Sequence, residues 1–166
     1  MNTALLKKNI SNIILSKSNS DINFFTTKKS FLDKNFSSLN DVFLEITKIS
    51  EKEYGIHSKQ LNLTSKKNDK NNLILFDNGI LLINSFLKKL KKNCLIFFRL
   101  EKPILFNNKS IDIIFTLLTP NNLKTSHKLQ ILAKLTRILQ GSNIRKEIKG
   151  VNKPEDVLAL LLFTSS

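Results

Sequence analysis

The chain is poor in the residues that build several common kinds of functional site. It has 166 residues, with no tryptophan, one cysteine, two histidines and four glycines. A single cysteine excludes a disulfide framework within the chain and favours a reducing compartment. We expect Cys94 to be a buried small apolar residue rather than a nucleophile, because it opens an apolar run. The histidines and the cysteine lack the spacing of a metal site, and four scattered glycines cannot build a phosphate-binding loop, so we predict no metal and no cofactor.

Long apolar runs and arginine are also scarce. No run approaches the roughly 20 residues that span a bilayer, and the N-terminus lacks the apolar core of a secretory signal, so we expect a cytoplasmic protein without a membrane span. The formal net charge is +14, but 24 of the 27 basic residues are lysine and only three are arginine. Arginine is the residue that binds phosphates and guanines in a bidentate manner. The lysine excess is typical of A/T-rich codon usage, so we do not favour nucleic-acid binding.

The clearest structural pattern lies in residues 94–140. Apolar runs at 94–98 and 111–118 predict two buried strands joined by a crossover, and Pro120 ends the second strand. A polar turn with several potential N-caps follows, and apolar residues then recur at helical spacing up to Gln140. This order of elements predicts an α/β domain.

Further elements are predicted on both sides of this stretch. Residues 1–36 are weakly patterned, so we place the domain at 37–166. Capping and turn signals predict, in order, a helix from Ser37 or Ser38 to Gly55, a short helix at 58–63, an exposed loop at 65–72, a strand at 73–76, a turn at 77–79 and a strand at 80–83. After a helix stop at 140–143, a short helix should run to Gly150, and a last helix should begin near Asn152 with Pro154 in its first turn.

Residues 86–92, FLKKLKK, follow an interruption of the second strand at Asn84 and Ser85. Their apolar residues are spaced as on a helix, among four lysines. One interpretation is a solvated amphipathic connection, which we favour. The other is a basic segment that binds acidic lipid or an acidic partner.

Several phrases of the sequence resemble a known protein family. They are LEKPI at 100–104 with Phe106, IDIIFTLLTP at 111–120, and TSH at 125–127 leading into the helix LQILAKL. Together they resemble the type 2 (fructose/mannitol) enzyme IIA domain of the phosphoenolpyruvate-dependent sugar phosphotransferase system, and its nitrogen-regulatory branch matches best in layout. The resemblance covers residues 78 to about 163, and more weakly the residues from 37. It implies an α/β fold, a mixed sheet of about four to five strands flanked by helices on both sides. It also implies a loop histidine that takes a phosphoryl group from the histidine-containing phosphocarrier.

The chain departs from this family at the residue that does the chemistry. The family's active loop reads roughly Gly-Ile-Gly-Asn-Gly-Ile-Ala-Ile-Pro-His-Gly, whereas residues 75–85 here read LFDNGILLINS. Asn78 and Gly79 are kept, but Asn84 stands in place of the phosphorylatable histidine. An imidazole nitrogen can accept a phosphoryl group, whereas the lone pair of an amide nitrogen is delocalised into the carbonyl. The family's assisting histidine is kept as His127.

The resemblance therefore implies an enzyme IIA-like protein of the nitrogen-regulatory type with a degenerate active site. We expect Asn84 and His127 to form its remnant, with Asn78, Gly79 and Ser85 as further binding residues. This favours a non-enzymatic role in which the protein docks onto another protein, either the phosphocarrier or a regulated target. Two alternatives stay open: His127 still accepts a phosphoryl group, or the chain is a small basic nucleic-acid-binding domain.

Overall fold

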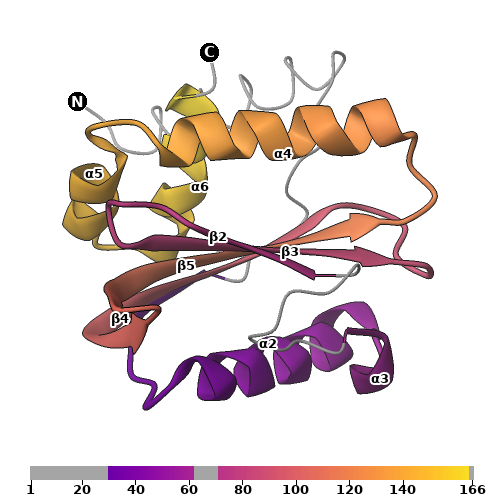
Figure 1. The fold of residues 1–166 in the computed structure, drawn as a ribbon, viewed down its shortest axis with the longest axis horizontal. Coiled ribbons are helices and arrows are strands. Elements are labelled where there is room, and N and C mark those ends of the chain that lie inside the picture. Colours follow the sequence, from indigo (N-terminus) through magenta and orange to yellow (C-terminus); the bar gives the residue numbers. More distant parts are fainter. Residues whose placement is uncertain (1–29, 62–70, 165–166) are drawn as a thin grey trace, which may run out of the picture.

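A mixed five-stranded sheet forms the middle layer of the computed structural model, which describes residues 30–61 and 71–164 (Figure 1). The strand order is β1–β4–β5–β3–β2. The strands are Ser30–Lys34 (β1), Asn71–Leu75 (β2), Ile80–Leu87 (β3), Cys94–Phe106 (β4) and Lys109–Pro120 (β5). β1 runs parallel to β4 and β3 parallel to β5, whereas β2–β3 and β4–β5 are antiparallel.

Helices cover both faces of this sheet (Figure 1). On one face lie α2 (Leu39–Tyr54) and α3 (Ser58–Leu61). On the other lie α4 (Thr125–Leu139), α5 (Ile144–Gly150) and α6 (Pro154–Thr164). The predicted fold class, an α/β fold with a mixed sheet between two helical layers, is confirmed.

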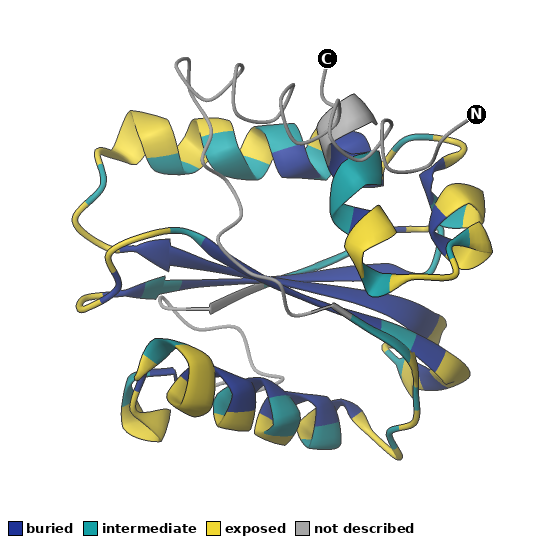
Figure 2. Cartoon of the chain, turned by 180° about the vertical axis from the view of Figure 1, so that it is seen from behind, coloured by how far each residue is buried: buried dark blue, intermediate teal, exposed yellow. Residues whose placement is uncertain are grey.

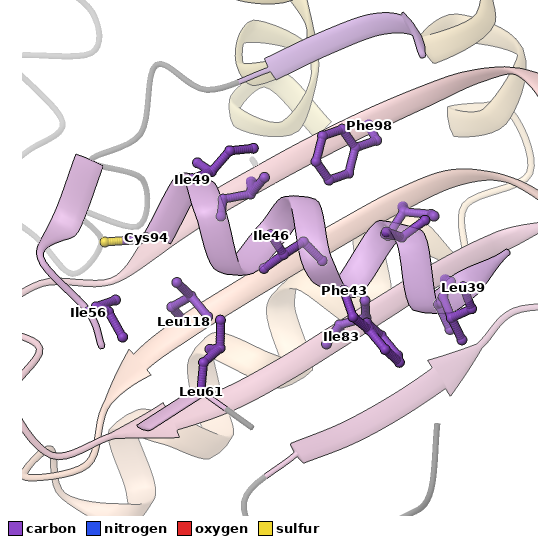
Figure 3. Packing of buried hydrophobic residues seen from close by; sticks show 14 of the residues in the cluster. Leu39, Phe43, Ile46, Ile49, Ile56, Leu61, Ile83, Cys94, Phe98 and Leu118 are labelled. Atoms are coloured by element: carbon purple, nitrogen blue, oxygen red, sulfur yellow. The ribbon is translucent and has the colours of Figure 1, made fainter. Parts of the chain in front are cut away.

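The helix α2 forms where the capping residues and the apolar spacing predict it. The Ser38 hydroxyl accepts a hydrogen bond from the Asp41 backbone N–H at 3.4 Å, and Gly55 ends the helix with a φ of 64°. A left-handed residue at this position is most often glycine, because a Cβ would be strained there. The buried side chains of α2 pack on Ile83, Phe98 and Leu118 of the sheet (Figure 3). They are Leu39, Val42, Phe43, Ile46 and Ile49.

The central strands β3 and β5 are buried on both faces, as their continuous apolar runs predict. Successive side chains of a strand point to opposite faces, and those of β3 alternate between two hydrophobic cores. Leu81 and Ile83 belong to the core under α2, whereas Ile80 and Leu82 belong to the core under α4, α5 and α6. Cys94 lies in the α2 core and is 2% exposed, so its predicted burial is confirmed.

The connection between β4 and β5 is a tight hairpin, so the predicted crossover is wrong. The two strands are antiparallel, and Phe106 pairs with Lys109 next to the turn. The turn residues Asn107 and Asn108 have φ values of 48° and 60°. Asparagine tolerates this left-handed region better than most residues, and two such residues in a row fit the right-handed twist of a hairpin.

The β3 strand does not break at Asn84 and Ser85, and no helix follows it. Asn84 pairs with Asn72 of β2 on one side and with Leu117 of β5 on the other. Ladders on both sides hold the polar pair in the strand, which continues to Leu87. The helical spacing at 86–92 therefore does not correspond to a helix, although residues 88–92 form a connection with exposed lysines, as in the interpretation that we favour.

Two further differences concern the edges of the sheet. β1 comes from the segment that shows little pattern in the sequence, and β2 begins at Asn71, inside the predicted loop. The rest of that loop, residues 65–70, lies outside the described residues, as do residues 1–29. The short helix α3 ends at Leu61, and its predicted extension also lies outside them.

The last three helices begin and end close to the predicted positions, but the first two lack a side-chain capping hydrogen bond. Lys124 is the N-cap of α4 and Asn143 that of α5, and neither makes a side-chain capping hydrogen bond. α6 starts at Pro154 with Glu155 and Asp156 in its first turn, where negative charge complements the helix dipole.

A buried carboxylate fixes α5 against the sheet. The Asp112 side chain is 7% exposed and accepts hydrogen bonds from both terminal nitrogens of Arg145, while Lys149 Nζ lies 2.6 Å from its Oδ2. Burial alone would raise the pKa of Asp112, but the hydrogen bonds and charges of Arg145 and Lys149 outweigh it and hold that pKa below its usual range.

A second arginine secures the end of α5. The Arg99 guanidinium donates to the backbone carbonyls of Ile148 (3.2 Å), Lys149 (3.2 Å) and Val151 (2.6 Å). The last carbonyls of a helix have no partner within the helix, so a cation that donates to them stabilises its end. The same guanidinium pairs with Asp33 of β1 at 3.1 Å.

Replacing Thr116 by valine should raise the free energy of unfolding by about 1 kcal/mol. A buried hydroxyl loses its hydrogen bonds to water on folding, and here no hydrogen bond within the protein compensates for that loss. Thr116 is 0% exposed, and its Oγ1 has no hydrogen-bond partner among the described residues. Urea unfolding would measure the change. Ile114→Thr, two residues away on the same strand, is the mirror control and should lower stability. Destabilisation by Thr116→Val would contradict the assignment of an unsatisfied hydroxyl.

Asp112→Asn should lower the free energy of unfolding at neutral pH by about 1–3 kcal/mol, less than for a fully buried pair, because Arg145 and Lys149 are each 37% exposed. A lowered carboxyl pKa contributes stability that is present above the unfolded pKa of about 3.9 and is lost as the pH falls through the folded value. The difference between the two proteins should therefore shrink in acid. The matched control is Asp77→Asn, since Asp77 pairs with Lys109 but is 98% exposed. Equal effects of the two substitutions, measured by thermal unfolding against pH, would contradict this account.

Candidate functional site

The site residues predicted from the sequence lie at two different ends of β3. Asn78 and Gly79 precede the strand, whereas Asn84 and Ser85 lie near its other end. Asn84 lies five positions after Gly79, which corresponds to about 16 Å along an extended strand. The structure therefore does not bring the five predicted residues into one site.

Asn78 and Gly79 hold the turn between β2 and β3. The Asn78 amide donates to the carbonyl of Leu139 at 3.0 Å, and Arg145 donates to the Asn78 carbonyl at 3.0 Å. Gly79 has a φ of 80°, and a Cβ there would lie 3.0 Å from the Arg145 guanidinium. Only glycine fits both the backbone angle and this close approach. These contacts give the two family residues a structural role in this chain.

An open hollow of about 500 Å³ lies beside this turn. Its charged groups are already paired, Lys109 with Asp77 at 2.5 Å and Arg145 with Asp112. The paired Lys109 lowers the pKa of Asp77 through a hydrogen bond and its charge. The hollow is lined by Asp77, Asn78, Gly79, Pro103, Lys109, Ser110, Asp112 and Arg145.

Asn84 is buried inside the β-ladder at the opposite end of β3. It is 1% exposed, and its Oδ1 accepts a hydrogen bond from Thr119 Oγ1 of β5 at 3.4 Å. The resemblance implies a loop at this position, whereas the structure has a strand with partners on both sides. The side chain at 84 is therefore not presented on a loop.

The Ser85 side chain points to the opposite face of the sheet from that of Asn84. Neighbouring residues of a strand face opposite sides, so Asn84 shares the α4 side with Leu82, and Ser85 shares the α2 side with Ile83. Ser85 is 0% exposed, and its hydroxyl has no hydrogen-bond partner among the described residues. Its side chain does not join that of Asn84.

His127 lies in the first turn of α4 and is exposed. Contacts of its neighbours bring this turn to the end of β3. The Lys128 Nζ lies 5.0 Å from the centre of the Phe86 ring and donates to the Asn121 carbonyl at 2.7 Å. The Asn121 N–H in turn donates to the Leu87 carbonyl at 2.9 Å. His127 and Asn84 thus lie at the same end of the sheet, but no hydrogen bond joins their side chains.

This end of the sheet offers hydrogen-bonding groups rather than a complete catalytic set. The carboxamide of Asn84 is no nucleophile, and no side chain among the described residues orients the His127 imidazole by a hydrogen bond. The other histidine, His57, accepts a hydrogen bond from the Lys59 backbone N–H at 3.3 Å between α2 and α3. Across residues 30–61 and 71–164, no three His, Cys, Asp or Glu side chains gather in a way that could hold a metal ion. None of the helices described there is long and apolar enough to cross a membrane.

Sequence reasoning missed two residues that shape this end, Thr119 and Phe86. Thr119 donates a hydrogen bond to the Asn84 side chain from 35 positions away in the sequence, and the Phe86 ring makes a cation–π contact with Lys128. Neither has a local signal. Both follow from the register that pairs Phe86 with Thr119.

Solved structures of three other proteins share this fold. Nitrogen regulatory protein IIA-Ntr from Neisseria meningitidis superposes with a TM-score of 0.66 at 23% identity, over 79% of this chain and 91% of that chain. A PTS IIA domain from Streptococcus pyogenes M1 GAS gives 0.56 at 15% identity, over 82% and 91%. The PTS IIA protein PtxA from Streptococcus mutans gives 0.51 at 13%, over 81% and 88%. At these identities the likeness concerns the fold.

Sequence comparison gives the family. No curated protein sequence matches the chain. The family model described as "Phosphoenolpyruvate-dependent sugar phosphotransferase system, EIIA 2" matches residues 23–163, which is most of the chain. The chain therefore belongs to the type 2 enzyme IIA family of the phosphotransferase system.

Proposed function

We propose that the protein is an enzyme IIA of the nitrogen-regulatory type that docks onto other proteins and accepts no phosphoryl group at position 84. The observation that carries this proposal is the burial of Asn84, a 1% exposed carboxamide where the family resemblance puts the acceptor histidine. The likeness to the Neisseria nitrogen regulatory protein supports the choice of branch. The partner is the phosphocarrier or a regulated target, in the cytoplasm.

Chemistry and access both argue against phosphoryl transfer to position 84. The amide nitrogen has no free lone pair with which to attack phosphorus. An acceptor must also come within about 3–3.5 Å of the phosphorus, in line with the leaving group. A side chain that is 1% exposed and held between two strands cannot meet a phosphorylated group on another protein in this way.

Docking requires less of the site than transfer does. A protein partner needs a stable, shape-complementary surface with exposed side chains. The fold of the family is kept, and the start of α4 exposes His127 and Leu129 beside the end of β3. These features support a binding role that survives the loss of the acceptor.

Phosphoryl transfer to His127 is the alternative, and its exposure is the observation that favours it. An exposed imidazole is a possible acceptor without further rearrangement. It lacks a hydrogen-bonding partner to orient it, which weighs against efficient transfer.

Incubation with phosphoenolpyruvate, enzyme I and the phosphocarrier should leave no acid-labile phosphate on this protein. The reason is that position 84 offers no imidazole and is closed to the donor. Radiolabelled phosphate followed by native-pH gel electrophoresis would measure it, with a histidine-containing type 2 enzyme IIA as the positive control. Stoichiometric labelling would overturn the proposal, and its loss in His127→Gln would establish the alternative acceptor.

Asn84→His alone should not restore full transfer. The new imidazole would stand in a strand at a position 1% exposed, and the glycines and proline of the family's loop are absent. The same labelling assay would test this, with circular dichroism to show that the variant folds. Labelling of Asn84→His to the level of the positive control would contradict this expectation. It would show that only the asparagine side chain, and not the backbone around it, prevents phosphoryl transfer to position 84.

A further inference from the structure

Several cations are paired with carboxylates at one end of the sheet, whereas a group of exposed lysines at the other end forms no ion pair with a described residue. At the end of the β2–β3 turn, the cations Lys109, Arg145 and Lys149 all bind carboxylates. At the opposite end, five exposed lysines form no ion pair with any described residue. This second group, which we name the basic end, comprises Lys88, Lys89, Lys91, Lys92 and Lys124.

The basic end is one continuous region because two loops meet there. Four of its lysines lie between β3 and β4, and Lys124 lies between β5 and α4. The hydrogen bond from the Asn121 N–H to the Leu87 carbonyl joins these loops. Figure 2 shows exposed residues in the loops that leave the sheet there and along the start of α4.

The strands and loops that carry these lysines contain no carboxylate near them in the sequence. Residues 84–100 and 113–146 contain no aspartate or glutamate, so α4 itself has none. The carboxylates of α2 belong to the other helical layer, although Glu51 and Glu53 stand at its C-terminal end, which packs near the start of β4. Five exposed cations that form no ion pair with a described residue produce a local positive field, which attracts and orients an anionic partner.

We propose that the basic end is a docking surface for an acidic face of a partner protein. The inference rests on the proposed function, because it takes the end of the sheet that holds Asn84 and His127 as the docking face. Leu129, which is 61% exposed in α4, adds an apolar contact beside the lysines. An apolar centre with a charged rim is the usual composition of a protein interface.

The structure argues against a membrane surface as the occupant. A segment that binds lipid needs an exposed apolar face to insert. The apolar residues among these lysines are already used within the fold, since Leu87 is 3% and Leu90 8% exposed. Phe86 is half-buried, with Lys128 over its ring.

The composition of the basic end also argues against nucleic acid. The two loops that hold these lysines, residues 88–93 and 121–124, contain no arginine and no aromatic side chain on which a base could stack. Arginine, which binds phosphate in a bidentate manner, is absent from them. Long-range attraction between lysines and carboxylates requires only opposite charge and no fixed geometry, so a lysine cluster fits an acidic protein surface.

A charge-reversal experiment can test this surface with a matched control. The test variant changes Lys88, Lys89, Lys91 and Lys92 to glutamate. The control variant changes four exposed lysines elsewhere, Lys48, Lys59, Lys102 and Lys153, to glutamate and so has the same net charge. Circular dichroism and thermal unfolding would establish that both fold. The probe is fluorescent poly-L-glutamate, and binding is measured by fluorescence anisotropy in about 0.15 M salt, where distant charges are largely screened.

We expect the basic-end variant to bind poly-L-glutamate at least about tenfold more weakly, and the control variant to stay within about threefold of the unchanged protein. Equal weakening in both would show that only net charge matters and would overturn the proposal. A DNA duplex and vesicles containing phosphatidylserine should respond equally to the two variants. A loss specific to the basic-end variant with either of these, but not with poly-L-glutamate, would also overturn it.

This test and the labelling experiment fail separately. Phosphoryl labelling of the chain would contradict the silent acceptor site and leave the binding comparison unaffected. Equal binding by the two charge-reversed proteins would contradict only the docking surface.

Discussion

The parallel ladder between β3 and β5 determines where each residue of the candidate site lies. It pairs Ile80 with Ile113 at one end and Leu87 with Pro120 at the other. β2 and β4 add a ladder on each outer side, so both strands are held from two directions. Polar residues that would end an isolated strand stay extended under this constraint. If they left the ladder, buried backbone N–H and C=O groups would lose their hydrogen-bond partners. Asn84 is the clearest case.

The same ladder holds the residue that the resemblance matches to the family's acceptor histidine. An acceptor has to be presented to another protein, which needs a backbone that leaves the sheet. In this chain the matching residue is an amide inside the ladder that accepts a hydrogen bond from Thr119. Asn78 and Gly79, which the family also has, serve the turn at the far end of the strand instead. The fold of the family is kept, and the burial of the residue that the resemblance matches to the acceptor is the basis of the binding role that we propose.

The rare arginines and the abundant lysines have separate roles. Arg99 and Arg145 each make several hydrogen bonds that fix α5, one to its last carbonyls and one to Asp112. A planar guanidinium can bind several acceptors at once, which a lysine does not do as well. Unpaired lysines gather at the other end of the sheet. Composition alone suggests a uniformly basic protein, whereas the structure pairs Lys109, Arg145 and Lys149 with carboxylates at one end and leaves a group of exposed lysines at the other.

The sequence by itself determined the elements that depend on neighbouring residues. Ser38 and Gly55 bound α2, Pro154 starts α6, and the apolar runs at 94–98 and 111–118 are strands, because caps, turns and burial patterns act over a few positions. The family resemblance added the layout of the sheet and the two positions, Asn84 and His127, of the candidate site.

Only the tertiary structure decided which strands pair and what the pairing does to local preferences. The β4–β5 hairpin, the edge strand β1 and the unbroken β3 could not be read from the sequence, since each depends on a partner distant in the chain. The segment 86–92 has the spacing of a helix, yet Leu87 and Leu90 are buried in the core under α2 and leave the lysines between them exposed. Long-range pairing and burial outweigh a local periodicity of a few residues, because the sheet satisfies more hydrogen bonds and removes more apolar surface from water than one helical turn can.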